Sequence, residues 1–398
     1  MASRRDFLGT VGVGSMGLAA LGRSARAQQP PGAEVLGAEG VKTTAKTDKV
    51  WRPISDRRIR VGIVGYGVCQ FGAAFGFQNH PNVEVAAVSD LFPDRCAALA
   101  KACRCEKTYP SLEEMVKDDS IEAVFLATDA PSHCRHALLA MKHGKHVATA
   151  VPAVFGSVDD AHELYDAVKT TGLTYMMFET SSFHDECHAM REAYRAGALG
   201  KLVYSEGEYY HDSVEQIDSY KGWRIGLPPM WYPTHAAAYY VAVTGGSFVD
   251  VTCKAMPSLK EKFLPGANRY DNPFGTEIAL FRTSEGGMSR IGVSWDTHIP
   301  GSETGRVYGQ RGSMIGMSYF GEEKNLPDLT RPALPKEVAS GGHGGSHGYL
   351  TDEYVSAILE KRKPLVDVAA ALNMTVAGVI AHQSALKDGE TLKVPQFA

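Results

Sequence analysis

Several widespread motifs are absent from this sequence, and each absence narrows the range of functions open to it. The chain contains no G-x-x-x-x-G-K-[ST] loop, so a P-loop kinase or nucleotide hydrolase is not indicated. Internal repeats and coiled-coil heptads are absent as well. Lysine and arginine form no basic stripe, and the formal net charge is −4, which argues against a nucleic-acid partner.

Cysteine and long apolar runs are also scarce. The seven cysteines are an odd number without zinc-site spacing, and Cys103-x-Cys105 is compatible either with a redox pair or with a helix end. Gly341–Gly348 holds two histidines that could bind a metal, but without further ligands at suitable spacing it favours a flexible glycine loop near the mouth of a site, so no metal is predicted. No run after residue 27 approaches the ~20 apolar residues that span a bilayer, so stable membrane insertion is not expected.

The first positive signal lies between Arg58 and Phe77. Ile59–Val64 is a short, β-branched apolar run typical of a buried parallel strand, and it turns through Gly65-Tyr66-Gly67 into a segment with helical character. Glycines at such a turn let the backbone approach a pyrophosphate, which the helix N-terminus then holds. The third fingerprint position holds Gln70, so the glycines alone are equally compatible with an ordinary tight turn.

Asp90 strengthens the dinucleotide interpretation. It ends the next predicted strand, Val83–Ser89, and lies 25 residues after Gly65, where an acid can bind the ribose hydroxyls of an adenosine. Its charge would repel a 2′-phosphate, and Leu91-Phe92 supply no cation to offset that repulsion. The sequence therefore predicts NAD rather than NADP, with Val68 and Arg95 also assigned to the cofactor site.

Helices and strands then alternate along the chain. Helices are predicted at 93–103, 111–117, 133–143 and 158–170, and strands at 122–127 and 145–150. Ser111 and Glu114 form a capping box at the second of these helices. Repeated βα units of this length predict a doubly wound parallel sheet, whose ligands bind at the carboxyl ends of the strands. We therefore expect Asp90, Thr128 to His133 and Ala150 to Pro152 to line one crevice.

Residues 1–27 resemble a targeting segment. Arg4 and Arg5 in S-R-R-D-F-L resemble the twin-arginine export signal, residues 9–21 are weakly apolar, and Ala25-Arg26-Ala27 matches a cleavage site. We expect export to the periplasm by the twin-arginine machinery, which carries folded proteins. A cytoplasmic protein with a disordered basic N-terminus is the alternative. Residues 28–57 predict an arm or linker that is either disordered or packed across a partner subunit.

Motifs throughout residues 58–398 resemble the glucose-fructose oxidoreductase, inositol dehydrogenase and MocA (Gfo/Idh/MocA) family. They include Gly144-Lys145-His146-Val147 followed by Pro152, the segment Arg195–Gly200, and Gly305–Gly316 with its G-x-x-G-S turn.

The resemblance implies an α/β architecture of two domains. Residues 58–178 would form a Rossmann NAD-binding domain. Residues 179–398 would form an α+β domain whose open, mostly antiparallel sheet serves substrate binding and oligomer contact. A sugar or cyclitol substrate and a homo-oligomer are the corresponding expectations.

The departures from the family pattern fall at the catalytic positions. The family's Glu-Lys-Pro is Ala150-Val151-Pro152 here, and valine cannot supply the charge and proton with which the lysine assists hydride transfer. The family's Asp-x-x-x-His survives only in part, because Trp231 replaces the aspartate while His235 is kept. These replacements argue against an ordinary lysine-assisted dehydrogenase mechanism.

Other residues resemble a subgroup of the family, the NAD-dependent glycosidases of the α-N-acetylgalactosaminidase type. They are Val151 before the proline, Gly222-Trp223-Arg224, Tyr232-Pro233-Thr234-His235 and His211. Such enzymes oxidise a sugar hydroxyl with bound NAD, eliminate the glycosidic leaving group, add water and reduce the ring again, without net redox change. The match is partial, since the subgroup's glutamate is Ala150 here and its tyrosine is Phe183.

Three residues of the second domain are candidates for acid–base catalysis. Either chemistry needs a base for a hydroxyl proton, and a neutral histidine titrates in a suitable range. His235 is the first candidate, Tyr232 could relay the proton, and His211 is a second acid or base for an elimination. Purely structural, hydrogen-bonded roles for these histidines are the alternative. The residues proposed to bind substrate are Glu179, Trp223 and Arg224.

Three functions are compatible with these features. An exported NAD-dependent oxidoreductase acting on a sugar or cyclitol hydroxyl comes first, because it requires only the nucleotide site and a base. A redox-neutral NAD-dependent glycoside hydrolase is the alternative. A non-catalytic protein that binds NAD and carbohydrate is the third, since the family's lysine, aspartate and glutamate are all replaced.

Overall fold

The computed structural model describes residues 49–212, 217–264, 266–299 and 302–398. The predicted signal segment, 1–27, and the first part of the predicted arm lie outside the described residues. Residues 49–57 pack against other parts of the same chain. The Trp51 indole donates to Asp352 at 3.0 Å, and the side-chain amide of Asn82 donates to the Ser55 carbonyl at 2.5 Å.

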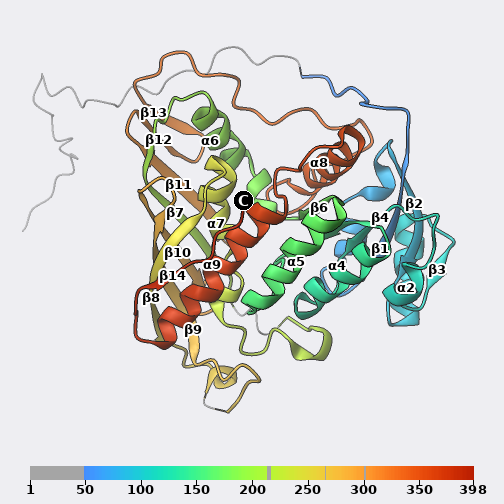
Figure 1. The fold of residues 1–398 in the computed structure, drawn as a ribbon, viewed down its shortest axis with the longest axis horizontal. Helices are drawn as coiled ribbons and strands as arrows, with labels where there is room; N and C mark the ends of the chain where they lie inside the picture. The colour runs from blue at the N-terminus through green and yellow to red at the C-terminus, as the bar shows by residue number, and fades with distance from the viewer. Residues whose placement is uncertain (1–48, 213–216, 265, 300–301) are drawn as a thin grey trace, which may run out of the picture. The chain divides into compact units, whose positions relative to one another are not determined.

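A six-stranded parallel sheet forms the first domain (Figure 1). Its spatial order is β3-β2-β1-β4-β5-β6, so the chain reverses direction across the sheet between β1 and β4. The strands are β1 (Ile59–Val64), β2 (Val83–Ser89), β3 (Thr108–Tyr109), β4 (Ala123–Leu126), β5 (His146–Thr149) and β6 (Tyr175–Met177). The predicted doubly wound parallel sheet is thus confirmed, and its reversal point is where such sheets bind ligands.

The helices of this domain begin and end close to the predicted positions. They are α2 (Pro93–Cys103), α3 (Leu112–Met115), α4 (His133–Lys142) and α5 (Val158–Thr171). Ser111 caps α3 by accepting a hydrogen bond from the Glu114 N–H at 3.3 Å, as the capping box predicts. Ser157 caps α5 in the same way, accepting from the Asp160 N–H at 3.1 Å.

The helix expected directly after the glycine turn requires a correction. α1 spans only Phe71–Ala74, and Gln70 before it is in the left-handed region with φ 51°. Gly76, at φ 77°, ends the segment two residues after α1, and the 3₁₀ turn η1 (Phe77–Asn79) follows. A single helical turn carries little of a helix dipole, so this connection offers backbone N–H groups rather than a long helix N-terminus to a bound anion.

The second domain is built on an eight-stranded sheet in the order β13-β12-β11-β7-β10-β9-β8-β14. Its strands are β7 (Leu202–Tyr210), β8 (Phe248–Pro257), β9 (Phe274–Thr283), β10 (Met288–Ser294), β11 (Ser302–Gly309), β12 (Gly312–Ile315), β13 (Ser318–Gly321) and β14 (Leu392–Lys393). Every neighbouring pair is antiparallel except β7 and β10. The expected open, mostly antiparallel sheet is therefore confirmed.

Two helices, α7 (Thr234–Thr244) and α9 (Val368–Leu386), pack on this sheet, and α6 (Asp185–Arg195) packs on α7. The start of α7 lies directly on β7, because a Cβ at Gly207 would be 1.9 Å from the Ala236 carbonyl oxygen. This close approach requires glycine at position 207. It also fixes the position of His235, the residue before Ala236.

The C-terminal part of the chain returns to the first domain. α8 (His347–Glu360) packs there through Thr351, whose hydroxyl donates to the Phe75 carbonyl at 2.7 Å, and through the buried Tyr354 ring beside Phe77. α9 contacts α5 and β6 as well as β8, and Figure 1 shows it between the two sheets. Among the helices of the described residues, none has the length and apolar character of a membrane span.

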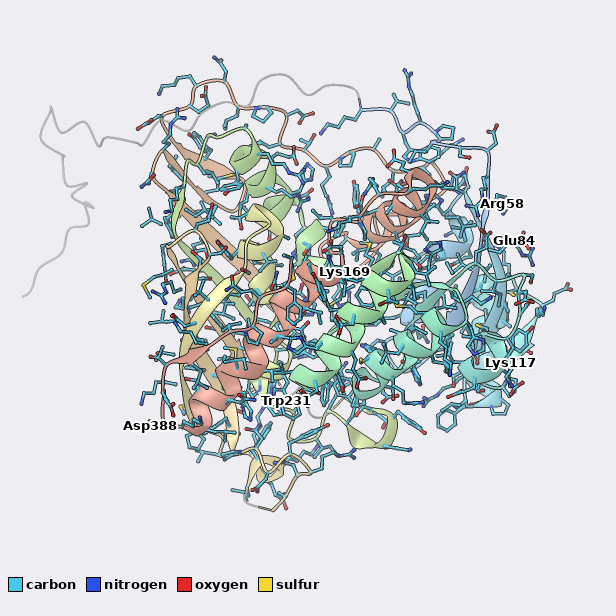
Figure 2. All side chains as sticks on the ribbon, viewed as in Figure 1. Arg58, Glu84, Lys117, Lys169, Trp231 and Asp388 are labelled. Carbon is cyan, nitrogen blue, oxygen red and sulfur yellow. The ribbon has the colours of Figure 1, made fainter. Side chains whose placement is uncertain are left out.

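Trp231, which stands where the family pattern has an aspartate, belongs to the junction between the domains. Figure 2 shows it between the outlying Lys117 and Asp388, which lie at opposite edges of the view. Its ring packs against Phe155 with centroids 5.2 Å apart and against His382 of α9 at 5.8 Å. The indole therefore has a packing role at this position.

Candidate functional site

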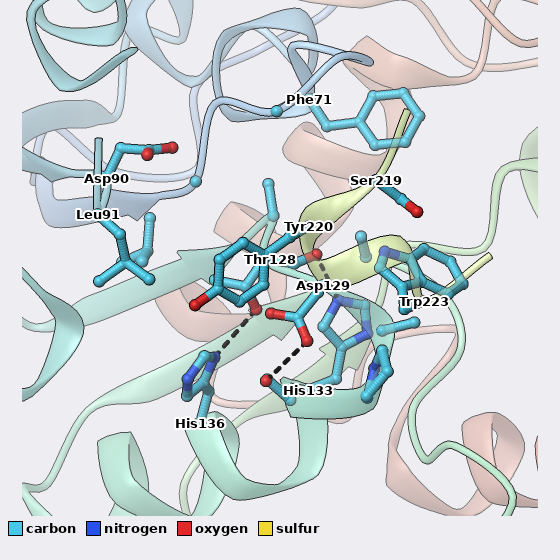
Figure 3. A pocket seen from close by; sticks show the side chains of 18 of the residues that line it. Phe71, Asp90, Leu91, Thr128, Asp129, His133, His136, Ser219, Tyr220 and Trp223 are labelled. Carbon is cyan, nitrogen blue, oxygen red and sulfur yellow. Dashed lines mark hydrogen bonds between the residues drawn. The ribbon is translucent and has the colours of Figure 1, made fainter. Parts of the chain in front are cut away.

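A pocket of about 580 Å³ opens at the carboxyl ends of the first sheet's strands (Figure 3). Its volume suits a cofactor with a small substrate. Asp90, Thr128 to His133, Ala150 and Val151 all line it, as the predicted crevice requires, but Pro152 does not. Residues 218–224 of the second domain, which we call the bridging segment, line the opposite side.

The glycine turn forms one wall of this pocket. Gly65 has φ +101°, and a Cβ there would lie 2.4 Å from the Ala127 carbonyl oxygen, so only glycine fits. A Cβ at Gly67 would meet no atom within 4 Å, although Gly67 lines the pocket. The backbone at Gly67 is therefore open to a close approach by a ligand, as a dinucleotide pyrophosphate requires.

Asp90 joins the second strand to this turn. Its carboxylate accepts hydrogen bonds from the Tyr66 N–H at 2.7 Å and the Phe92 N–H at 2.9 Å. Each carboxylate oxygen has a second lone pair, so Asp90 can still accept from ribose hydroxyls. Arg95 lies over the Phe92 ring at 4.6 Å, and Tyr220 of the bridging segment contacts that ring from the second domain, with centroids 6.2 Å apart. Like Arg95, the predicted Val68 lines the pocket.

His133 connects two loops of the pocket wall. Its Nδ1 lies 2.8 Å from the Pro152 carbonyl oxygen and its Nε2 lies 3.2 Å from that of Thr128. Burial lowers the pKa of this histidine. His133 and Pro152, both predicted to bind the cofactor, are therefore in contact with each other, and through His133 the end of β4 is tied to the segment that follows β5.

A buried acid–imidazole cluster lies behind the second-domain wall of the pocket. His235, in the first turn of α7, points its Nδ1 at Glu179 Oε1, 2.8 Å away, and at the Thr180 hydroxyl, 3.2 Å away. Glu303 of β11 places a second carboxylate oxygen 3.7 Å from the same nitrogen. Glu179 is fully buried just after β6, so the cluster joins the end of the first domain to two elements of the second.

These two carboxylates determine the charge of His235. Burial by itself would lower the pKa of the imidazole, but the negative charges of Glu179 and Glu303 outweigh burial and raise it to about 9. The charges of His235 and His184 in turn hold the pKa of Glu303 below its usual value, despite burial. The neutral histidine expected from the sequence is therefore an imidazolium at neutral pH in the folded chain.

Tyr232 lies between this cluster and the pocket. Tyr232 lines the pocket, whereas His235 does not, and the two rings are 5.8 Å apart between centroids. Burial raises the pKa of Tyr232 to about 12, with an opposing effect of Arg224, so the phenol is protonated at neutral pH. In the part of the chain that the structure describes, no hydrogen bond engages His235 Nε2.

The other predicted site residues are divided between the pocket and its surroundings. Trp223 and Arg224 line the pocket as part of the bridging segment. Glu179 lies in the buried cluster rather than on the pocket surface. His211 follows β7, where its Nδ1 is 3.1 Å from the Asp212 carbonyl oxygen, and it does not line the pocket. Its predicted role in an elimination stays a prediction.

Sequence reasoning missed Glu303 and the residues around it. Its carboxylate accepts from the Ser181 hydroxyl at 2.9 Å and lies 3.5 Å from His184 Nε2. The 341–348 loop covers this region, because a Cβ at Gly344 would be 2.7 Å from the His184 ring. Glu303 stands far along the chain from Glu179 in a strand without a recognisable motif, so no local signal could have identified it. Among the described residues, no group of three side chains is placed to hold a metal ion.

Comparison with known proteins relates the first domain to an oxidoreductase family. Residues 59–179 match the Gfo/Idh/MocA family model, described as an oxidoreductase family with an NAD-binding Rossmann fold. The first domain is therefore similar to the NAD-binding domain of that family. The match supports an NAD-dependent enzyme, and the residues around Gly67 and Asp90 fit that cofactor.

Relatives of lower identity cover most of the length of this chain. A glycosyl hydrolase family 109 protein of Solibacter usitatus is 25% identical over 389 residues, covering 85% of this chain and 88% of the relative. One from Streptomyces niveus is 26% identical over 383 residues, covering 85% and 77%.

Solved structures share the fold. A levoglucosan dehydrogenase in complex with NADH and levoglucosan superposes with a TM-score of 0.67 at 17% identity, covering 85% of this chain and 100% of that one. The apo scyllo-inositol dehydrogenase of Lactobacillus casei gives 0.66 at 15% identity, covering 85% and 99%.

The two glycines of the turn provide a matched test of the NAD site. We expect Gly67→Ala to fold normally but to bind NAD at least about tenfold more weakly, because its methyl group would occupy space the cofactor needs, at a cost of about 1–3 kcal/mol. Gly65→Ala should lose both stability and binding, since its Cβ meets the Ala127 carbonyl. Calorimetric titration with NAD and thermal melting measure the two effects. Unchanged NAD affinity in Gly67→Ala would show that the cofactor does not approach this turn.

Proposed function

We propose that this enzyme uses NAD to oxidise a hydroxyl group of a sugar or cyclitol. The observation that carries the proposal is the Glu179–His235–Glu303 cluster, which lies behind Tyr232 at the wall of the NAD pocket. NAD, when bound, supplies the hydride acceptor. Oxidation also releases the hydroxyl proton, and the cluster provides a group that can hold it.

The chain's own residues divide this work. His235 is held in orientation by Glu179 at Nδ1, so only Nε2 can exchange a proton with a substrate oxygen. The two carboxylates make the imidazole a stronger base, so its neutral form, whose share grows as the pH approaches about 9, takes up the proton during oxidation. The resulting imidazolium can return that proton in the reverse reduction. Tyr232, protonated and on the pocket wall, can donate a hydrogen bond to the same oxygen.

A redox-neutral glycoside hydrolase is the second candidate function. Two observations favour it. The relatives that cover most of the chain carry the name glycosyl hydrolase family 109 protein. Val151, in place of the family lysine, lines the pocket and can neither donate nor accept a proton. In such a cycle the first step is the same oxidation, so both functions use the same cluster.

One experiment separates these functions. The purified protein is analysed for bound nicotinamide by absorbance and mass, then incubated with free sugars, cyclitols and aryl glycosides while NADH and released phenol are followed. NADH from a free sugar or cyclitol supports the oxidoreductase, and phenol release without net NADH supports the glycosidase. A folded, NAD-loaded protein that is silent on every substrate would contradict both and favour a binding protein.

We also propose export through the twin-arginine pathway to the periplasm and function there as a homo-oligomer. The support is the sequence pattern of residues 3–27 and the family resemblance of the second domain. Replacing Arg4 and Arg5 by lysine should retain the protein in the cytoplasm, as cell fractionation would show. Sedimentation of the purified protein measures its assembly state.

A further inference from the structure

Arg224 is a buried cation on the pocket wall without an anionic partner. Its residue exposure is 9%, and it lines the pocket. Its guanidinium lies over the Trp223 ring at 4.3 Å and 5.8 Å from the centre of the Tyr232 ring. Among the residues that the structure describes, no carboxylate forms an ion pair with it. Removing a charge from water is costly unless an anion pairs with it, so this arrangement is incomplete without a ligand.

Most acidic side chains described in and behind the pocket wall are engaged elsewhere. The Asp90 carboxylate accepts from two backbone N–H groups, Asp129 accepts from the Ser132 hydroxyl at 2.9 Å, and Glu179 pairs with His235. Asp218 belongs to the bridging segment but forms no ion pair with Arg224. Ala150 and Val151, which line the same pocket, are uncharged. No pocket acid therefore neutralises the guanidinium.

We propose that the substrate carries a carboxylate, as a uronic acid or its glycoside does, and that Arg224 binds this group. The inference rests on the proposed function. The guanidinium is a planar fork suited to bidentate binding of a carboxylate, and stacking on Trp223 fixes its plane before a ligand arrives. Tyr232 connects this subsite to the reacting end, because the centre of its ring lies 5.8 Å from that of His235 and 5.8 Å from the Arg224 guanidinium.

The pyrophosphate of NAD is a second source of anionic oxygens in the same pocket. Its expected position is the turn from Gly65 to Gly67, whereas Arg224 lies beside Tyr232, near the acid–imidazole cluster. The Arg224 guanidinium lies 5.8 Å from the centre of the Tyr232 ring, and the centroid of that ring is 5.8 Å from that of His235, which places the guanidinium toward the catalytic end. We therefore favour the substrate as the source, and the experiment separates the two.

The test compares acidic sugars with their neutral parents. Calorimetric titration measures the binding of two pairs of sugars, glucuronate with glucose and galacturonate with galactose. Each sugar is titrated into the NAD-loaded wild type, Arg224→Gln and Arg224→Lys. We expect the wild type to bind each acid at least about tenfold tighter than its parent, and Arg224→Gln to lose about tenfold to hundredfold on the acids alone. Arg224→Lys should fall between them, because it keeps the charge but loses the fork. Lys142→Gln, at the exposed end of α4, is the charge-matched control.

Several outcomes would overturn the inference. The first is that the wild type binds each acidic sugar no more tightly than its neutral parent. The second is that Arg224→Gln releases NAD while its preference for acidic over neutral sugars is unchanged. That second result would assign the guanidinium to the cofactor. If Arg224→Gln fails to fold, the comparison of Arg224→Lys with wild type decides. Preferential binding of uronates without NADH or phenol formation would support the inference while the proposed function fails. Turnover of neutral and acidic sugars at equal rates would support the proposed function and contradict the inference about Arg224.

Discussion

Replacing His235 by alanine is expected to lower kcat/KM for the substrate about 10²- to 10⁴-fold, the usual contribution of a positioned acid–base group. The physical reason is that, among the described residues, neither histidine that lines the pocket has an unengaged ring nitrogen, whereas no hydrogen bond engages Nε2 of His235 behind Tyr232. His133 is held by two carbonyl groups, and His136 Nδ1 and Nε2 face the Thr128 hydroxyl and Arg135. Steady-state kinetics on the substrate identified by the sugar panel measures the loss.

Stability needs a separate control in this experiment, because His235→Ala leaves the Glu179 charge buried without its partner. Breaking such a pair costs about 3–5 kcal/mol. His235→Asn keeps an N–H that can donate to Glu179 but cannot exchange protons in the neutral range. We expect it to recover stability and not activity. His298→Ala, at a fully exposed histidine, should change neither. Wild-type turnover by His235→Asn would remove His235 from the mechanism.

Glu179→Gln is expected to shift the pH dependence of the reaction to lower pH. Glu179 is the larger of the two charges that raise the pKa of His235 to about 9, and burial acts in the opposite direction. Without this charge the pKa of the imidazole must fall. Since oxidation needs Nε2 free of a proton, the wild-type oxidation rate should rise with pH up to about 9, and the variant should reach its plateau at lower pH. Rates measured between pH 5 and 10 test this.

The same pair makes the stability of the wild type depend on pH. The pKa of His235 is raised on folding from its ordinary 6.5 to about 9, so the folded state binds the proton more tightly than the unfolded chain. This stabilisation is fully present below pH 6.5 and is lost as the pH rises through about 9. The shift corresponds to on the order of 3 kcal/mol of unfolding free energy. Denaturant unfolding at pH 6 and pH 9.5 should reveal it in the wild type and not in Glu179→Gln.

Glu192→Gln is the matched control for both measurements. Glu192 lies on α6 and pairs with Arg195 at the surface, where an ion pair contributes little to stability. Its pH–rate profile and unfolding free energy should match those of the wild type. An unchanged profile in Glu179→Gln would mean that His235 does not control the rate.

The local structure of the first domain was predictable from the sequence. β1 and β2 have the predicted limits, because β-branched apolar runs suit strands buried on both faces. α2 likewise begins at Pro93 and ends at Cys103, since proline fits the first helical turn. The exception is α1, which was predicted as a helix and is a single turn. Two features limit the length of α1. Gly76 is in the left-handed region, and Gly72 is in close contact with the Gly65 carbonyl.

The candidate site was predictable only where its chemistry follows a local motif. The glycine turn and Asp90 belong to one βαβ unit, so their spacing in the sequence indicated the nucleotide pocket. His235 and Tyr232 were identified by a short segment that resembles a family motif. Neither signal indicates which acid faces the histidine, and Glu303 in β11 remained unrecognised.

The sequence by itself determined the family resemblance, the order of helices and strands and the position of the cofactor turn, because these depend on residues close together in the chain. Only the tertiary structure decided the charges in the site. His235 is an imidazolium because Glu179 and Glu303 arrive from separate elements, and among the described residues no carboxylate is ion-paired with Arg224. Burial and charge pairing sum over distant segments, and no pattern within one segment encodes that sum.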